Sequence, residues 1–183
     1  MNKEKELIDK LIDLAFAEDI GDGDHTTLSC IPATAMGKSK LLIKEVGVLA
    51  GIEVAKEIFN RFDPTMKVEV FINDGAEVKP GDVAMVVEGK VQSLLQTERL
   101  MLNVMQRMSG IATMTRKYAK KLEGTHTRVL DTRKTTPGMR ILEKMAVKIG
   151  GGVNHRIGLF DMILLKDNHV DFAGGIDKAI TRA

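Results

Sequence analysis

A chain of 183 residues is long enough for one domain with a solid core, or for one small domain and part of a second. Its composition, 44% hydrophobic and 28% charged, is typical of soluble globular proteins and excludes the disordered and membrane-spanning classes. The net charge of +2, with six Phe, one Tyr and no Trp, argues against a nucleic-acid-binding protein, which usually has a basic surface and stacking aromatic side chains.

The single cysteine, Cys30, excludes a disulfide framework and a cysteine-based metal site, as expected in a reducing cytoplasm. The N-terminal sequence is charged and lacks an apolar stretch of signal-peptide length, and no later stretch is apolar enough to cross a membrane. We therefore expect a cytoplasmic protein that does not bind membranes.

The first segment predicts an amphipathic helix that ends before Gly21, because apolar residues recur at helical spacing: Leu7, Leu11, Ile12, Leu14 and Ala15. The sequence GDGDHTT follows at 21–27. Its Asp22, Asp24 and His25 allow a metal loop, but an EF-hand needs a closing Glu where Ala33 stands. Turn or helix-capping chemistry explains the same residues, and it is the interpretation we prefer.

The next segment predicts a small sheet with helices packed against it. Apolar residues occupy every second position of 66–72, which is the period of a strand with one covered face. Further strands are expected at 38–46 and 83–88, and a short helix at 52–59 that ends before Asp63 and Pro64. Turns rich in Gly, Asn, Asp and Pro separate the later strands.

A long helix is predicted from about residue 93, where Ser93 and Gln96 have the spacing of a capping box. Its apolar face is rich in methionine, which is far more often core than a ligand site. This face comprises Leu94, Leu95, Met101, Leu102, Met105, Met108 and Ala112. Arg99 lies on the turn between Leu95 and Leu102, and a snorkelling arginine beside a buried face explains it from the residues alone.

After Gly124 the pattern changes to strand, helix and strand. Strands are predicted at Arg128–Asp131 and Met162–Leu165, with a helix at Pro137–Ile149 between them. Gly174 and Gly175 then open a further helix. This order implies parallel strands joined by a right-handed crossover.

The chain is thus predicted to have two domains, with a boundary in the long helix near Met108. Residues 1–107 form an N-terminal α/β sandwich, and residues 108–183 form the first part of an α/β barrel. The predicted fold class is α/β (α+β), with the barrel truncated at its C-terminal side.

Five basic side chains follow predicted strands or lie in the glycine-rich turn: Arg133, Lys134, His155, Arg156 and Lys166. Functional side chains of α/β barrels sit at the C-terminal ends of strands, so these charges are expected to share one rim. Thr136 and Pro137 are predicted as N-cap and first residue of the next helix, whose dipole would add positive potential. Guanidinium groups bind carboxylate or phosphate through paired hydrogen bonds, so the rim predicts a pocket for a ligand with several negative charges. Unrelated surface residues are the alternative.

Two features near this rim have two interpretations each. Gly150, Gly151 and Gly152 either cradle phosphate through their amides or cap the preceding helix, and we prefer the cap. His169 is either a phosphate contact or a plain turn residue.

Five segments form an ordered set of motifs: EDIGDGDHTT, TERLMLNVMQRMSGIAT, LDTRKTTPGMR, GGGVNHRIGLFD and ILLKDNH. Together they closely resemble the quinolinate phosphoribosyltransferase family, also called carboxylating nicotinate-nucleotide pyrophosphorylases. The resemblance extends over essentially all 183 residues, and the shared order of several motifs makes it specific.

The resemblance implies a two-domain enzyme, an N-terminal α/β sandwich followed by an unusual α/β barrel, assembled as a homodimer or a higher even homo-oligomer. It implies phosphoribosyl transfer from phosphoribosyl pyrophosphate to quinolinate with decarboxylation, in de novo NAD biosynthesis. The products would be nicotinate mononucleotide, pyrophosphate and carbon dioxide. Mg²⁺ would accompany the pyrophosphate group of the substrate.

The resemblance also implies roles for individual residues. Arg133, His155 and Arg156 would hold the quinolinate carboxylates, and Lys134 and Lys166 would contact quinolinate or the phosphates. Thr132 would line the same strand end, and Arg99 would reach into the site of the neighbouring subunit. No side chain is implied as a nucleophile or a general acid or base, because the protein would act by positioning the reactants and neutralising charge.

A whole barrel takes about 250 residues, and the family's barrel continues beyond this sequence with acidic residues for ribose and Mg²⁺ and glycine-rich phosphate contacts. We therefore expect these 183 residues to carry most of the quinolinate half of the site, to turn over little or not at all alone, and to expose apolar surface. One alternative is a related phosphoribosyltransferase acting on another pyridine or pyrimidine acid. The other is a non-catalytic anion-binding or dimerisation module.

Overall fold

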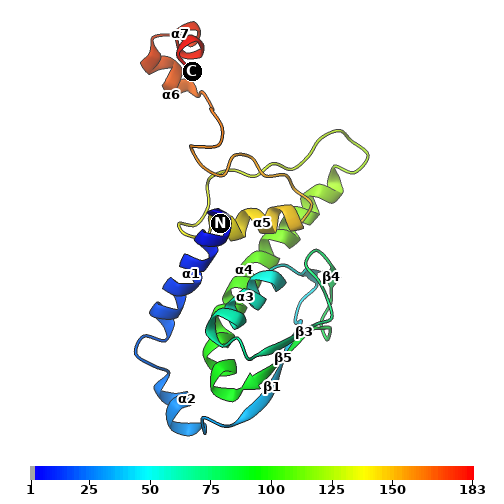
Figure 1. Cartoon of the computed structure of the whole chain (residues 1–183). Coiled ribbons are helices and arrows are strands. Elements are labelled where there is room, and N and C mark those ends of the chain that lie inside the picture. Colours follow the sequence, from blue (N-terminus) through cyan, green and yellow to red (C-terminus); the bar gives the residue numbers. More distant parts are fainter. Residues whose placement is uncertain (1–2) are drawn as a thin grey trace.

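The computed structural model describes residues 3–183, which form an α/β body and a C-terminal arm, residues 159–183 (Figure 1). In chain order the elements are α1 (Lys3–Asp19), α2 (His25–Cys30), β1 (Met36–Leu42), β2 (Gly47–Val48), α3 (Ile52–Phe62), β3 (Lys67–Val70), β4 (Glu77–Val78), β5 (Val83–Lys90), α4 (Val91–Lys121), α5 (Arg140–Ile149), α6 (Asp167–Ala173) and α7 (Ile176–Arg182). This mixture of helices and strands confirms the predicted α/β class.

The central strand of the main sheet is β5, which pairs antiparallel with β1 on one side and β3 on the other. Its residues Ala84, Met85 and Val87 are buried. Lys38 lies opposite Glu88 in the register, and their side chains form an ion pair of 2.9 Å. A second, two-stranded sheet pairs β2 with β4. The predicted strands at 66–72 and 83–88 are confirmed, whereas the one predicted at 38–46 ends at Leu42.

The long helix α4 runs from the main sheet to α5 and contributes much of the core (Figure 1). Most of its predicted apolar face is buried, namely Leu94, Met101, Met105, Met108 and Ala112, which confirms the methionine-rich face as core. The same core includes Ile58 and Phe59 of α3. Leu95 differs from the prediction because its side chain is exposed.

Two helix starts are capped by aspartate. Asp24 accepts a hydrogen bond from the Thr27 amide (3.0 Å), so the GDGDHTT sequence caps α2, as we preferred. Asp74 lies in the turn before β4 and caps α3 from outside, because its Oδ1 accepts from the Ile52 amide (2.9 Å). Burial raises the pKa of the Asp74 carboxyl.

The predicted capping box at Ser93 and Gln96 is wrong. α4 already begins at Val91, so both residues lie inside the helix. Ser93 Oγ donates to Asp63 Oδ2 (2.7 Å), and the Gln96 side chain donates to the Gln92 carbonyl (3.0 Å). Ser93 therefore makes a tertiary contact, and Gln96 makes a contact within the helix.

The second half contains one parallel bridge, between Leu130 and Val153, in place of two predicted strands. The Val153 amide donates to the Val129 carbonyl (2.8 Å), and the Asp131 amide donates to the Val153 carbonyl (3.1 Å). The strand predicted at Met162–Leu165 is wrong, since these residues have no strand partner in residues 3–183 and lie in the exposed arm. Periodicity cannot distinguish a buried strand from another short apolar run. The strand expected at Arg128–Asp131 is reduced to the bridge.

Helix α5 begins at Arg140, so the prediction of Thr136 and Pro137 as its N-cap and first residue is wrong. They belong to a preceding turn, and Gly138, with φ of +80°, cannot continue a right-handed helix. The C-terminal cap is confirmed. Gly151 has φ of +95° and its amide donates to the Lys148 carbonyl (3.1 Å), while the Gly152 amide donates to the Val147 carbonyl (2.9 Å). This is the Schellman pattern.

The end of α5 approaches α4 very closely. A Cβ added at Gly150 would lie 2.5 Å from the Ala112 carbonyl oxygen and 2.7 Å from Thr115 Cβ. Arg116 of α4 donates from Nε to the Gly150 carbonyl (3.1 Å), which satisfies a group at the helix end. We call this contact the α4–α5 seam.

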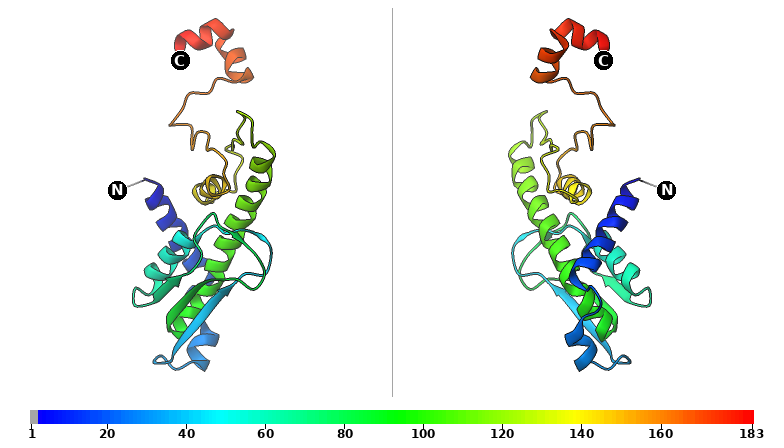
Figure 2. Two further views of the ribbon diagram at one scale, coloured as in Figure 1. Left: turned by 90° about the vertical axis from the view of Figure 1, so that its right-hand side faces the viewer. Right: turned by 90° about the vertical axis from the view of Figure 1, so that its left-hand side faces the viewer.

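Helices α6 and α7 of the arm lie apart from the body in both side views (Figure 2), whereas Phe160 at the start of the arm lies against Lys3 of α1. The two helices pack on each other, and the helix predicted after Gly174 and Gly175 is confirmed as α7. Large apolar side chains are exposed along the arm: Leu159, Phe160, Ile163, Phe172, Ile176 and Ile180. Among the helices of residues 3–183, none has the length and apolar character needed to span a bilayer.

The α4–α5 seam predicts opposite effects for two Gly→Ala substitutions. Gly150→Ala should lower the free energy of unfolding by about 1 to 3 kcal/mol, because the new methyl group has to displace α4. Gly110→Ala, the matched control inside α4, meets nothing within 4 Å and should raise this free energy by about 0.5 to 1 kcal/mol. Urea unfolding followed by circular dichroism measures both, and an unchanged midpoint for Gly150→Ala would contradict the close approach.

Candidate functional site

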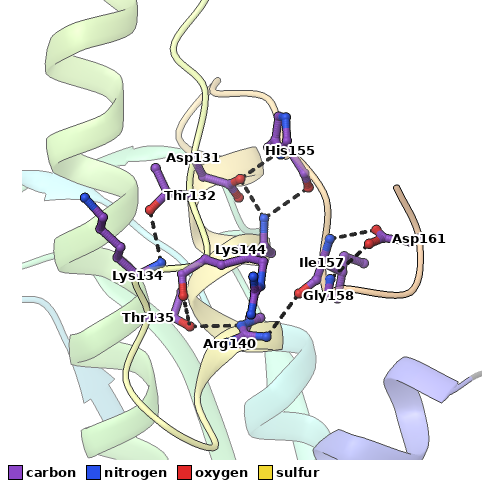
Figure 3. A network of polar contacts seen from close by, with 11 residues as sticks. Asp131, Thr132, Lys134, Thr135, Arg140, Lys144, His155, Ile157, Gly158 and Asp161 are labelled. Atoms are coloured by element: carbon purple, nitrogen blue, oxygen red, sulfur yellow. Dashed lines mark hydrogen bonds and ion pairs between the residues drawn. The ribbon is translucent and has the colours of Figure 1, made fainter. Parts of the chain in front are cut away.

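Two loops diverge from the Leu130–Val153 bridge and carry most of the predicted site residues (Figure 3). The first loop, 131–139, contains Thr132, Arg133 and Lys134, and the second loop, 154–158, contains His155 and Arg156. Both loops follow parallel paired backbone and therefore leave it at the same end. The structure thus brings these five residues to adjoining loops, with Val153 rather than Met162–Leu165 supplying the second paired segment.

A buried ion pair holds the two loops together. Lys144 Nζ of α5 lies 2.6 Å from Asp131 Oδ1, and the two side chains are only 3% and 7% exposed. The same Asp131 oxygen accepts from the His155 amide (2.8 Å), and Lys144 Nζ also donates to the His155 carbonyl (3.1 Å). Charged groups that are withdrawn from water need such multiple partners. We call these three residues the Asp131–Lys144–His155 cluster (Figure 3).

The first loop is shaped by short-range hydrogen bonds. Thr132 Oγ1 accepts from the Lys134 amide (3.1 Å), and the Thr132 and Lys134 side chains are exposed. Arg140 of α5 donates to Thr135 Oγ1 (3.1 Å) and to the Ile157 carbonyl (3.2 Å), so it links the first loop to the second (Figure 3).

The second loop holds Arg156 in a buried position. One guanidinium nitrogen of Arg156, Nη1, donates to the Met162 carbonyl (3.1 Å). Asp161 accepts from the amides of Ile157 (2.7 Å) and Gly158 (3.0 Å), and these backbone hydrogen bonds hold the pKa of its carboxyl below its ordinary value. The last residues of the loop are therefore held by a carboxylate at the start of the arm.

A second ion pair joins α4 to α5, and its two residues also bind Thr136 of the first loop. Arg107 Nη2 lies 2.6 Å from Glu143 Oε1, and it also donates to Thr136 Oγ1 (3.2 Å). Glu143 Oε2 accepts from the Thr136 amide (3.3 Å). Burial acts to raise the pKa of Glu143, but hydrogen bonds from Arg107 and Thr136 outweigh burial and leave the pKa below its ordinary value.

Two predicted site residues lie away from the loops. Lys166 is exposed in the arm, where its amide donates to His169 Nδ1 (3.0 Å), so His169 acts here as a local contact at the start of α6. Arg99 is exposed on α4, about two turns, or ~12 Å, before Arg107. Within this chain, neither cation joins the cluster.

Two apolar grooves lie elsewhere on the body. One, of about 480 Å³, lies between β1, β2 and α4, and includes Leu42, Met105 and Met114. The other, of about 410 Å³, lies between α1 and the first loop and includes Leu11 and Arg140. None of the seven predicted site residues lines either groove.

Metal-binding chemistry is sparse in the described part of the chain. Residues 3–183 contain no group of three His, Cys, Asp or Glu side chains that could hold a metal ion.

The residues whose side chains hold the two loops in place were missed in the sequence: Asp131, Lys144, Arg140, Arg107 and Glu143. One signal was present, since Glu143 and Lys144 follow Ile141 and Leu142 directly and all four are buried. Charged residues on a helix surface that faces the core need partners of opposite charge. The identity of those partners depends on which loops meet.

Comparison with known proteins gives consistent matches along the chain. The N-terminal domain model of quinolinate phosphoribosyl transferase matches residues 24–109, and the C-terminal domain model matches residues 111–183. Quinolinate phosphoribosyltransferase (decarboxylating) 1b of Nicotiana tabacum is 49% identical over 172 residues, which are 93% of this chain and 48% of that protein. The probable nicotinate-nucleotide pyrophosphorylase (carboxylating) of Synechocystis is 44% identical over 95% of this chain and 59% of its own length.

Solved structures also match this chain over nearly its whole length. NadC from Streptococcus pyogenes has a TM-score of 0.90 at 41% identity, covering 96% of this chain and 62% of that one. The nicotinate-nucleotide pyrophosphorylase from Francisella tularensis has a TM-score of 0.89 at 38% identity, covering 97% and 62%. The chain therefore spans about half the length of the plant relatives and under two thirds of these solved chains.

The Glu143 carboxylate predicts a pH-dependent contribution to stability. Because its pKa is lowered in the folded state, this contribution is present above the ordinary value of 4.5 and is lost as pH falls through the folded value. At pH 7, Glu143→Gln should lower the free energy of unfolding by about 1 to 2 kcal/mol, a modest value because the Arg107 head is half-exposed.

The measurement is urea unfolding at pH 7 and at pH 3 to 4, with Glu98→Gln as control. Glu98 is exposed on α4 and should show no effect at either pH. The difference between wild type and Glu143→Gln should shrink in acid. A difference that is constant with pH would show that the charge of Glu143 is not responsible.

Proposed function

Because this chain belongs to the quinolinate phosphoribosyltransferase family, we propose that it serves phosphoribosyl transfer from phosphoribosyl pyrophosphate to quinolinate. The products would be nicotinate mononucleotide, pyrophosphate and carbon dioxide, in NAD biosynthesis. Since the chain spans about half the length of its plant relatives, we assign to it the quinolinate-binding part of the site, formed by the loops 131–139 and 154–158.

The observation that carries this proposal is the unsatisfied hydrogen-bond donor of Arg133. Its Nε is the one buried side-chain nitrogen or oxygen within residues 3–183 that has no hydrogen-bond partner. An unsatisfied buried donor costs about 1 to 3 kcal/mol, and more when it is charged. A ligand carboxylate beside Arg133 would remove this cost and accept a charge-assisted hydrogen bond.

The second loop would bind the other carboxylate of quinolinate. Arg156 uses one nitrogen for the Met162 carbonyl, and a guanidinium has five N–H donors, so donors remain for a ligand. The His155 backbone is held by Asp131 and Lys144, which leaves its imidazole available. Two carboxylates on neighbouring ring carbons would thus meet two loops, which favours quinolinate over an acid with one carboxylate.

The chemistry proposed for this site needs no nucleophilic side chain. The ring nitrogen of quinolinate would attack the anomeric carbon of the sugar as the bond to pyrophosphate breaks, with fixed cations neutralising the charge that develops. The resulting pyridinium would stabilise the carbanion left when the adjacent carboxylate departs as carbon dioxide, and a proton would then complete the product. Thr132, Arg133, His155 and Arg156 would orient the ring throughout.

The phosphoribosyl half would be completed by other groups. Lys134 is exposed beside Arg133 and would contact quinolinate or a phosphate, and Lys166 would do so only if the arm packs against the body. Mg²⁺ would arrive on the pyrophosphate of the substrate, as it usually binds phosphates together with water.

A homodimeric assembly, or a higher even homo-oligomer, is part of the proposal and rests on the resemblance to the family, which assigns Arg99 to the site of a neighbouring subunit. Arg99 is exposed on α4 and lies about two turns from the nearest contact with the first loop, a position compatible with that assignment. A cytoplasmic location remains a prediction, and cell fractionation would test it.

A non-catalytic anion-binding or dimerisation module is the second candidate, since the cations on the two loops would suit anion binding without catalysis. The quinolinate site would be the same in an anion-binding module. Release of pyrophosphate from phosphoribosyl pyrophosphate and Mg²⁺ separates the two, because a binding module releases none.

The binding proposal predicts that the folded chain prefers quinolinate to nicotinate in calorimetric titration. Arg133→Gln should weaken quinolinate binding by about 10- to 100-fold, the equivalent of losing a charge-assisted hydrogen-bond pair. Arg128→Gln is the matched control, since Arg128 is exposed five positions earlier and should leave the affinity unchanged. Equal binding of both acids, or no binding to folded protein, would refute the assignment.

A further inference from the structure

The Asp131–Lys144–His155 cluster lies behind the proposed site rather than within it. Asp131 and Lys144 are almost fully buried and 2.6 Å apart, so neither is free to reach a ligand. Their charges cancel at short range, so the pair adds little net attraction for an anion. Its effect on a ligand must therefore act through the residues it holds.

The cluster holds the His155 backbone from both sides. Asp131 Oδ1 accepts from the His155 amide (2.8 Å), and Lys144 Nζ donates to the His155 carbonyl (3.1 Å). Asn154, the preceding residue, binds the same pair. Its side-chain amide is oriented with Nδ2 toward two acceptors, so that Nδ2 donates to Asp131 Oδ2 (3.0 Å) and to the Lys144 carbonyl (2.9 Å). Both peptide groups of His155 are thus fixed by groups that themselves cannot move into solvent.

The same pair fixes the start of the first loop. Asp131 precedes Thr132 and Arg133 directly, and its amide is bonded to the Val153 carbonyl (3.1 Å). Lys144 projects from α5, which the α4–α5 seam fixes on the body. One carboxylate and one ammonium therefore set the separation between Arg133 and the neighbouring pair of His155 and Arg156.

We propose that Asp131 and Lys144 are positioning residues that set the distance between the two carboxylate-binding loops, and thereby the preference for a ligand with two adjacent carboxylates. This inference rests on the proposed quinolinate function. A ligand with one carboxylate engages one loop and is insensitive to the distance, whereas a ligand with two engages both. Recognition of this kind is lost when groups shift by about 0.5 to 1 Å.

The selectivity between quinolinate and nicotinate tests the proposal, because a purely structural role would not change it. Lys144→Met removes the tie to the His155 carbonyl but leaves the Asp131 carboxylate buried, which endangers folding. The double variant Asp131→Asn/Lys144→Met removes both charges, so the folding penalty is smaller. Asn154→Ala is milder still and leaves the ion pair intact. Lys148→Met is the matched control, one turn later on α5 and exposed.

Calorimetry of both acids would be combined with circular dichroism to confirm folding. In the folded variants quinolinate affinity should fall by about tenfold or more while nicotinate affinity changes little, with a smaller fall for Asn154→Ala and none for Lys148→Met.

Three outcomes would overturn the inference. Unchanged affinities in the folded variants would refute the positioning role and leave the quinolinate site standing. An equal loss for both acids would show that the cluster supports the fold alone. A wild-type chain with no preference for quinolinate would refute the proposed function and the positioning role together.

Discussion

The α4–α5 seam is the contact on which the arrangement of this protein depends. Gly150 brings the end of α5 against the α4 backbone at Ala112, and Arg116 fixes the last carbonyls. α4 is itself fixed by the sheet and by α3, against which it packs. The two loops are anchored on α5. Their position therefore follows from the packing of α4 against the sheet and α3, although neither loop takes part in the sheet's pairing. A site of this kind depends on a scaffold that lies outside it.

The two loops are stabilised differently from the sheets and the helices packed on them. Backbone pairing around them is limited to one bridge, and side chains supply most of the remaining contacts. Burying an ion pair does not by itself stabilise a fold, because desolvation offsets much of the attraction. However, an arrangement of the loops that leaves one of the two buried charges unpaired has a much higher free energy. Asp131 with Lys144, and Arg107 with Glu143, therefore specify how the loops sit more than how strongly they are held.

The N-terminal half was largely predictable because its helices and strands bury one face each. The methionine-rich face of α4, except for Leu95, and the strand β3 within 66–72 were placed correctly from periodicity. The second half departs from prediction where apolar residues are not buried, as at Met162–Leu165, since composition alone does not distinguish an exposed run from a strand.

Sequence motifs located the cations but not the ion pairs that hold their loops. Arg133 was predicted after a short strand and His155 in the glycine-rich turn, and both were expected on one rim. Their anchoring could not be predicted, because Asp131 and Lys144 are 13 positions apart and Arg107 and Glu143 are 36 apart. Those pairs depend on a chain path that glycine turns and one backbone bridge determine. The partner of each buried charged residue therefore follows from the path and not from its neighbours in sequence.

The strand order of the main sheet has a consequence for how the chain folds. Within residues 3–183, β1 and β3 do not pair with each other, and each pairs only with β5, which comes later in the chain. At one end of the β1–β5 register, Met36 lies opposite Lys90. Contacts between segments this distant in sequence close large loops, which slows folding. α4 begins at Val91, the residue after β5 ends. The strand that completes the sheet is therefore continuous with the helix that covers it, and we expect sheet closure and helix docking to form one cooperative folding event.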